Sequence, residues 1–447
     1  MKFSSGFSRL TGYVIPVTLL GGLVIFNHQP GCSLPHPKLQ KMSGTFRTPF
    51  LLALSVSILF GFCLTAQTTD TPSLETVASA LEFREIGPAV MGGRIADIAV
   101  NPDNPNTWYV AVGSGGVWKT TNRGTTWEPV FDAQASYSVG CVTLSPQNPE
   151  VVWVGTGENV SGRHVGWGDG IYRSTDGGKT WENKGLGTSE HIGKILVDPR
   201  NSDVVFVAAE GPLWASGGER GLYRSQDGGD TWELVLEIDA NTGVTDVEFD
   251  PSNPDILYAA AYQRRRHVWS LLAGGPNSGI YKSTDNGTTW KQVRPGLPDG
   301  DMGKIGLAVT PSNPNLVYAT IEAAEGEKGF YRSTNKGESW ERRNGYTSGG
   351  TGPHYYQEIE ASPVDPNLVY QMDVFLHVTR DGGKTFDYLG TGREKHSDNH
   401  ALWIDPADGM HLLAGTDAGL YESYDEGTTW RHFPNLPVSQ FYKLGLD

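Results

Sequence analysis

Cysteine is scarce in this chain, with 3 residues among 447. Cys32 and Cys63 lie in the first 66 residues, so the remainder keeps only Cys141. A single thiol excludes a disulfide framework within that part of the chain, and it excludes a cysteine-rich metal site. Because Cys141 stands in the apolar run VGCVTL, it is best interpreted as a small buried hydrophobic residue.

Positive charge is also in short supply. The chain has 35 Lys and Arg against 50 Asp and Glu, which gives a formal net charge of −15. Such an acidic chain is a poor partner for nucleic acid or for an anionic membrane surface. Charged residues of both signs reach only 19%, whereas glycine is abundant at 57 residues. This composition is typical of many short strands joined by glycine-rich turns.

Long hydrophobic runs are limited to two, at residues 13–26 and 50–66. Each is short for a membrane-spanning helix, although one of them serving as a membrane anchor is the alternative. The second run follows Met42 and Arg47 and ends in small residues before Gln67, as a secretory signal does. We therefore predict a leader over 1–66 whose true start is Met42, cleavage after Ala66 and a linker over 67–81. The mature protein would be secreted, periplasmic or at the cell surface, with no stable membrane span.

One short motif recurs seven times, and its last residue returns every 44 to 58 positions. Such a period indicates a repeat architecture. The copies are TTNRGTTW (120–127), STDGGKTW (174–181), SQDGGDTW (225–232), STDNGTTW (283–290), STNKGESW (333–340), TRDGGKTF (379–386) and SYDEGTTW (423–430).

The residues around each motif predict four strands per repeat. In the third repeat, strands are expected at 191–199, 204–210, 221–226 and 230–236, with the motif as the hairpin between the last two. A four-stranded unit of about 50 residues is the blade of a β-propeller. We therefore predict an all-β fold, a propeller of at least seven blades over 82–447. Seven copies favour a structural role for the turn Asp or Asn, which can hold the hairpin through its own backbone: Asn122, Asp176, Asp227, Asp285, Asn335, Asp381 and Asp425.

The motif S-x-D-x-G-x-T-W resembles the Asp box of the BNR-repeat propellers. Turns of the D-P-x-N-P type stand between the expected first and second strands, at NPDNP (101–105), DPSNP (250–254) and TPSNP (310–314). In this order of elements the chain resembles sortilin-type propeller domains and xyloglucanase-type glycoside hydrolases. The resemblance implies the fold more strongly than an activity, because Asp boxes occur in enzymes and in binding proteins alike.

The two ends of the predicted propeller look like unfinished strands. Residues 81–88 resemble the outer strand of a blade, and 437–447 resemble the inner strand of a following one. We expect them to belong to one incomplete blade of a propeller truncated at its C-terminus. The alternative is that the two segments pair around a closed seven-bladed ring.

The order of strands predicts which face carries function. The D-P-x-N-P turns and the Asp boxes share one face, so the long loops at 158–170, 210–221 and 262–279 share the other. Binding residues usually sit on such loops. Trp167, Trp214 and Trp269 in these loops could stack on sugar rings or on a peptide, or could pack the loops together.

The entries to the inner strands should converge on the mouth of the central channel on this loop face. They carry ionisable or polar residues in most blades: Arg94, His191, Lys194, Asp246, Lys304, His354, Gln357, Asp398 and His400. His396, Asp398 and His400 alternate, so in an extended segment they would project to one side. They could act as an acid–base pair, bind a metal or close the channel with hydrogen bonds. We expect ligand binding by Arg94, His354, His396, Asp398 and His400 with Trp167 and Trp269, and neither a metal nor a cofactor.

An enzyme of the xyloglucanase type would need two carboxylates across the cleft. The resemblance implies that one follows the second strand of the first blade in a T-D-x-G-G segment, but here GSGG (113–116) places Gly113 there. The nearest substitute is Asp417 in TDAG (416–419), and Glu158 and Asp398 are further candidates. The sequence therefore favours an exported propeller that binds a polysaccharide or peptide at the channel mouth. The alternative is a xyloglucanase-like glycoside hydrolase that uses Asp417, Glu158 or Asp398.

Overall fold

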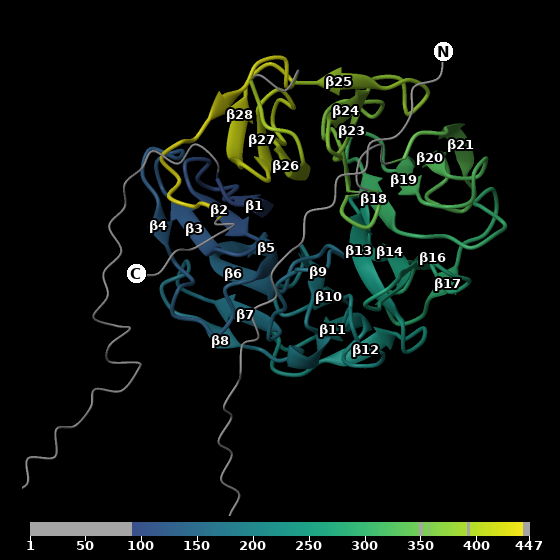
Figure 1. The fold of residues 1–447 in the computed structure, drawn as a ribbon, viewed down its shortest axis with the longest axis horizontal. Coiled ribbons are helices and arrows are strands. Elements are labelled where there is room, and N and C mark those ends of the chain that lie inside the picture. Colours follow the sequence, from purple (N-terminus) through teal and green to yellow (C-terminus); the bar gives the residue numbers. More distant parts are fainter. Residues whose placement is uncertain (1–91, 348–351, 357, 391–393, 441–447) are drawn as a thin grey trace, which may run out of the picture. The chain divides into compact units, whose positions relative to one another are not determined.

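The computed structural model describes residues 92–347, 352–356, 358–390 and 394–440, and these form a ring of β-sheets (Figure 1). The chain divides at Leu81 into two units, and all described residues belong to the second. Their only helical turn is the 3-10 turn η1 (Gly187–Ser189), so the described part is β throughout. No helix among these residues has the length and apolar character needed to cross a membrane.

Seven antiparallel sheets make up the described ring, six of four strands and one of five, and each sheet runs from an inner to an outer strand. The first three blades are β1 (Ile95–Val100), β2 (Trp108–Val112), β3 (Gly116–Thr120) and β4 (Glu128–Pro129); β5 (Val139–Ser145), β6 (Asn148–Thr156), β7 (Ile171–Ser174) and β8 (Glu182–Asn183); β9 (Ile192–Val197), β10 (Val205–Ala209), β11 (Gly221–Ser225) and β12 (Glu233–Leu236).

The fourth blade carries a fifth strand, β15, which pairs with the far end of the long strand β14 and forms a projecting hairpin. The remaining blades are β13 (Thr242–Asp250), β14 (Asn253–Arg266), β15 (Leu271–Ala273), β16 (Gly279–Ser283) and β17 (Lys291–Gln292); β18 (Ile305–Val309), β19 (Val317–Ile321), β20 (Gly329–Ser333) and β21 (Glu341–Asn344); β22 (Ile359–Ala361), β23 (Val369–Gln371), β24 (Leu376–Thr379) and β25 (Asp387–Leu389); β26 (Asn399–Ile404), β27 (Leu412–Thr416), β28 (Gly419–Ser423) and β29 (Arg431–His432).

The first and last blades pack directly against each other, which closes the ring with seven blades. Ile95 and Trp108 of the first blade share one buried cluster with Leu413, Leu420 and Phe433 of the seventh. The predicted all-β propeller of four-stranded blades is thereby confirmed. The expected strand at 81–88 lies outside the described residues, as does most of 437–447. The described part of the latter segment, 437–440, is not a strand, and its Val438 is buried in the same cluster.

The Asp boxes are the hairpins between the third and fourth strands, as predicted. In the second blade Ser174 Oγ accepts a hydrogen bond from Gly178 N at 2.8 Å, and Asp176 Oδ1 accepts one from Thr180 N at 2.9 Å. The Thr180 hydroxyl also donates to Asp176 Oδ2 at 2.7 Å, and this bond, followed by the one from Thr180 N, lowers the pKa of Asp176 to about 2. Trp181 Nε1 donates to Val130 O of the preceding blade at 2.6 Å, so the motif also joins neighbouring blades.

The alternation of strands separates two faces. Turns between first and second strands and the Asp boxes lie on one face, whereas the loops between second and third strands lie on the other, here called the loop face. The inner strands β1, β5, β9, β13, β18, β22 and β26 surround the axis of the ring (Figure 1). The start of each inner strand therefore reaches the channel mouth on the loop face.

Candidate functional site

A repeated backbone contact places equivalent residues of different blades around the channel mouth. The first residue after a second strand donates its N–H to the carbonyl of the residue at the start of the first strand. Gly113 N lies 2.9 Å from Arg94 O in the first blade, and Asp417 N lies 3.0 Å from Asp398 O in the seventh. The same contact joins Glu210 to His191 and Glu322 to Lys304. Arg94, His191, Lys304 and Asp398 therefore occupy equivalent positions at the starts of their inner strands.

Arg94 holds two carboxylates on this rim. Its Nε lies 2.7 Å from Asp417 Oδ1, and its Nη1 lies 3.2 Å from Glu158 Oε2. The guanidinium also stands over the ring of Tyr355 at 5.7 Å from the ring centroid. Arg94 thus unites a residue from the seventh blade and one from the second, and we call Arg94, Glu158 and Asp417 the Arg94 cluster.

The pKa values of the two carboxyl groups in the Arg94 cluster are shifted in opposite directions. Burial alone would raise the pKa of Asp417, but His400 and Arg94 outweigh it and hold the pKa well below its usual range. Glu158 is more deeply buried, and this burial raises its pKa despite the nearby Arg94 and His400. Ser114 Oγ donates to Glu158 Oε1 at 3.3 Å. A site with one ionised and one more readily protonated carboxyl group suits acid–base chemistry.

His400 supports Asp417 from the inner strand β26. Its Nε2 lies 3.1 Å from Asp417 Oδ1, an ion-pair distance without the alignment of a hydrogen bond. Its ring stacks on Tyr356 at 5.2 Å with an interplanar angle of 24°. The Tyr356 hydroxyl in turn donates to Asp398 Oδ1 at 2.6 Å. Tyr356 therefore links Asp398 to His400, and His400 in turn contacts Asp417.

The expectation that His396, Asp398 and His400 project to one side is wrong. Asp398 has a left-handed backbone with φ of 62°, and the register of β26 shifts between Asn399 and Ala401. Asp398 also accepts a hydrogen bond from Ser397 Oγ, whereas the His396 ring contacts Ser397 O. The alternating sequence is therefore not one extended strand, and no group of three metal-ligating side chains occurs within the described ranges.

A groove opens beside the Arg94 cluster, over the loops of the first and second blades. Its cavity measures about 1090 Å³ and is lined by Arg94, Glu158 and Ser114 and by aromatic side chains of strand β3 and of several loops: Trp118, Phe131, Tyr137 and Tyr355. A neighbouring hollow shares Ser114 and Tyr137 and extends the groove to Trp167. Tyr137 and Trp167 are 66% and 70% exposed, so their rings are available to a ligand.

His354 and the arginine-rich hairpin close another part of the loop face. Ser161 N donates to His354 O at 2.9 Å, and Arg266 Nη2 donates to Ser161 O at 2.7 Å. Arg264 forms a buried ion pair with Glu210 at 2.6 Å. Segments of the second, third and fourth blades and the segment that precedes the sixth blade are thereby joined on the loop face.

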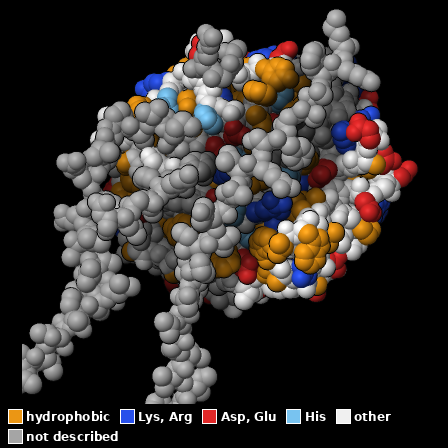
Figure 2. Space-filling view, in the orientation of Figure 1, with side chains coloured by type: hydrophobic (Ala, Val, Ile, Leu, Met, Phe, Trp, Pro, Cys, Tyr) orange, Lys and Arg blue, Asp and Glu red, His pale blue; other side chains and the backbone are white. Residues whose placement is uncertain are grey.

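The exposed tryptophans of the third and fourth blades lie outside the groove-lining set. Trp269 is 82% exposed near the tip of the β14–β15 hairpin, where it stacks on His267 at 5.4 Å. Trp214 is 42% exposed in the loop after β10. In Figure 2, hydrophobic side chains gather beside Lys and Arg side chains at the lower right, over the region of β11–β16 in Figure 1. Of the three predicted tryptophans, Trp167 is the one that the groove includes.

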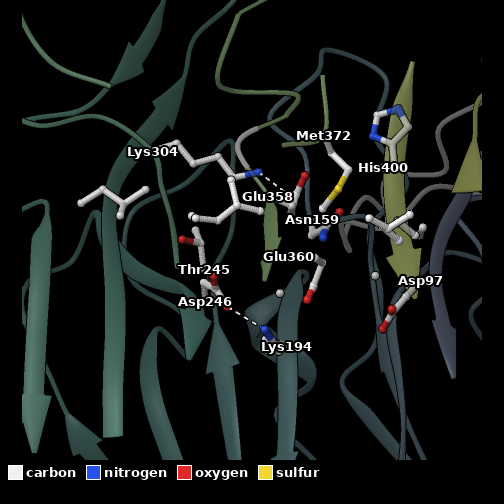
Figure 3. Close-up of a pocket in the computed structure, with 18 residues that line it drawn as sticks. Asp97, Asn159, Lys194, Thr245, Asp246, Lys304, Glu358, Glu360, Met372 and His400 are labelled. Atoms are coloured by element: carbon white, nitrogen blue, oxygen red, sulfur yellow. Dashed lines mark hydrogen bonds and ion pairs between the residues drawn. The ribbon is translucent and has the colours of Figure 1, made fainter. Parts of the chain in front are cut away.

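Charged side chains line the cavity below the channel mouth (Figure 3). Lys194 lies 3.0 Å from Asp246, and Lys304 lies 3.0 Å from Glu358. Asp246 also accepts the backbone N–H of Leu307 from the next blade at 2.8 Å. The cavity here is only about 90 Å³, so these residues join neighbouring blades rather than form a path for a polymer.

Sequence reasoning missed several residues of the site. Tyr355 and Tyr356, which contact Arg94 and His400, were not among the predicted residues, nor was Ser114. The signal that could have found the tyrosines is their place in the loop before an inner strand, directly after the predicted His354.

Sequence comparisons match the chain to two kinds of protein. Residues 169–297 match the family model described as Sortilin-Vps10 (sortilin, neurotensin receptor 3). A xyloglucanase of Acetivibrio thermocellus is 28% identical over 56% of this chain and 30% of its own length. Xyloglucanases of a Paenibacillus species and of Hypocrea jecorina are each 24% identical, over 79% and 78% of this chain. The chain spans between 30% and 49% of the length of these three relatives.

Solved structures agree on the fold. The GH74 xyloglucanase from Xanthomonas campestris superposes with a TM-score of 0.59 at 17% identity, over 79% of this chain and 56% of that one. An ancestral GH74 enzyme gives a TM-score of 0.58 at 22% identity, over 79% and 48%. The chain is therefore a seven-bladed Asp-box propeller, similar in sequence to sortilin-type domains and to xyloglucanases, as the motifs predicted.

Proposed function

We propose that this protein binds and hydrolyses a β-linked polysaccharide of the xyloglucan class in the groove beside the Arg94 cluster. The observation that carries the proposal is the pairing of Asp417 and Glu158 on one guanidinium, with opposite pKa shifts. The groove reaches from these carboxylates to Trp167 and is lined with aromatic rings, which suit stacking on sugars.

Glycoside hydrolysis needs two carboxyl groups in different protonation states. One gives a proton to the oxygen of the bond that breaks, and the other accepts a proton from water or attacks the sugar directly. Asp417, held ionised by Arg94 and His400, fits the second task. The sequence similarity to xyloglucanases supports xyloglucan as the class of substrate. The chain spans less than half of the length of those relatives.

Binding without cleavage is the second candidate function. The observation in its favour is that Arg94 contacts both carboxylates and neutralises part of their charge. A propeller of this kind would hold a polysaccharide or a peptide in the same groove. We further propose that the protein is exported and that its mature form begins after Ala66, because 50–66 has the pattern of a signal sequence.

One assay distinguishes hydrolysis from binding without cleavage. The purified protein is incubated with xyloglucan and β-glucan oligosaccharides, and new reducing ends and binding heat are measured on the same samples. A hydrolase releases reducing ends, and Asp417→Asn abolishes the release. Saturable binding with no new reducing ends would instead identify a binding protein. Glu237→Gln is the matched control, because Glu237 is exposed and lies outside the groove-lining residues.

A further inference from the structure

We propose that Glu158 is the proton donor of this site and that Gly113 is the residue that allows it to stand there. This inference rests on the function proposed above and adds the second carboxyl group of the reaction. It arises from the contact between a glycine of the first blade and a glutamate of the second.

Gly113 leaves open the space that the Glu158 side chain fills. A Cβ atom built on Gly113 would lie 2.5 Å from Glu158 Oε1 and 3.1 Å from its Cδ, closer than packed atoms allow. The backbone of Gly113 has no left-handed φ, so only this contact demands a glycine. Any side chain at position 113 therefore has to push the carboxyl group of Glu158 away.

Three other blades carry a carboxylate at this position. The residue that follows the second strand is a carboxylate in the third, fifth and seventh blades, namely Glu210, Glu322 and Asp417. In the first blade the equivalent residue is Gly113. The carboxyl group over this position comes from Glu158 of the next blade, one residue beyond that blade's own equivalent, Gly157. The second blade thus supplies a carboxyl group over the position where the first blade has a glycine.

The surroundings of Glu158 suit a proton donor. Its side chain is 8% exposed, and burial raises its pKa, so it keeps a proton more readily than Asp417 does. It faces the groove, which it lines together with Ser114 and Tyr355. His191 Nδ1 contacts the Glu158 carbonyl at 2.8 Å and fixes the backbone below the carboxyl group.

Hydrolysis of the glycosidic bond needs no reactant other than water. The bond between the anomeric carbon and the bridging oxygen breaks, and the Glu158 carboxyl group transfers its proton to that oxygen. The oxygen of water forms the new bond to the anomeric carbon, and Asp417 receives the proton that water loses. Solvent then returns a proton to Glu158 and removes one from Asp417.

The test compares two substrates that differ in their need for a proton donor. In a xyloglucan oligosaccharide the leaving group is a sugar hydroxyl oxygen, which must be protonated as the bond breaks. In a nitrophenyl glycoside the leaving group departs as a stable phenolate and needs no proton. We expect Glu158→Gln to lower kcat/KM on the oligosaccharide by about 100-fold or more, the usual contribution of general acid catalysis. On the nitrophenyl glycoside the loss is expected to be much smaller.

Gly113→Ala provides the independent variant. The added methyl group displaces the Glu158 carboxyl group without backbone strain, so we expect the same difference between the substrates, measured at a temperature at which circular dichroism shows the variant to be folded. Gly300→Ala is the matched control, because a Cβ there meets only Glu327 Oε2 at 3.4 Å. Its activity on both substrates should equal that of the unmodified protein.

The outcomes distinguish this inference from the proposed function. If Asp417→Asn abolishes turnover while Glu158→Gln or Gly113→Ala leaves turnover unchanged, the proposed hydrolase function is supported and the role of Glu158 is refuted. An equal loss on both substrates in Glu158→Gln would also refute proton donation. If the unmodified protein cleaves neither substrate, both the proposed hydrolysis and the role of Glu158 are refuted.

Discussion

Arg94 and Asp417 lie 323 positions apart in the chain, yet Arg94 Nε and Asp417 Oδ1 meet at 2.7 Å. The contact crosses the seam where the first and seventh blades close the ring. The candidate site is therefore assembled by ring closure itself, since neither end of the propeller carries the site alone. Stability of the seam and integrity of the site should change together.

Replacing Arg94 tests this coupling. Arg94→Met leaves Asp417 and Glu158 without their shared cation, and the side chain of Glu158 is only 8% exposed. Leaving buried polar groups unpaired typically costs about 1–3 kcal/mol, and we expect a loss of that size in the free energy of unfolding. Denaturant unfolding measures it, and Arg94→Lys, which keeps the charge, should lose less. Unchanged stability in Arg94→Met would show that the seam does not depend on this pair.

The charged channel predicts a pH dependence of stability. Burial, together with Glu248, Asp246 and Asp97, raises the pKa of Glu360 to about 8, against the opposing effect of Lys194. In the unfolded chain the same group ionises near its ordinary value of 4.5. The folded state therefore binds the extra proton between these values, and the free energy of unfolding should fall as the pH rises from about 4.5 to about 8.

Glu360→Gln isolates this contribution, because glutamine cannot ionise. A tenfold difference in proton affinity corresponds to ~1.4 kcal/mol, so the variant should gain on the order of 2 kcal/mol or more at pH 8 relative to pH 5. Urea midpoints at the two pH values give the comparison. The exposed Glu237→Gln serves as control. A variant with the same pH slope as the unmodified protein would contradict the prediction.

The sequence predicted the fold because the fold repeats. Seven copies of one hairpin specify a blade, and turn residues such as Asp176 and Gly178 have local tasks that their residue types reveal. The site was only partly predictable, since Arg94, Glu158 and Asp417 come from three blades. Their convergence follows from the order of strands, but the left-handed φ of Asp398 does not follow from alternating residues.

The leader prediction concerns residues outside the described part of the chain and can be tested directly. We expect the protein recovered from a periplasmic or culture fraction to begin at Gln67, because small residues precede this position. N-terminal sequencing or intact mass gives the answer. Ala66→Arg should block processing and leave the precursor uncleaved, whereas a change within the linker, Ser73→Ala, should not. A membrane-bound product that retains residues 1–66 would indicate an anchor instead.

The two most exposed tryptophans of the loops should differ in their effect on ligand binding. Trp167 lines the extension of the groove, whereas Trp269 stacks on His267 near the tip of the β14–β15 hairpin, outside the groove-lining residues. Stacking on an aromatic ring contributes about 0.5–1.5 kcal/mol, so Trp167→Ala should weaken binding of xyloglucan oligosaccharides by roughly 2- to 12-fold. Trp269→Ala is the matched control, because it removes an equally large ring that is 82% exposed and should leave the affinity unchanged. Titration calorimetry on the Asp417→Asn background measures both without turnover. The opposite ranking of the two variants would place the ligand over the hairpin and away from the Arg94 cluster.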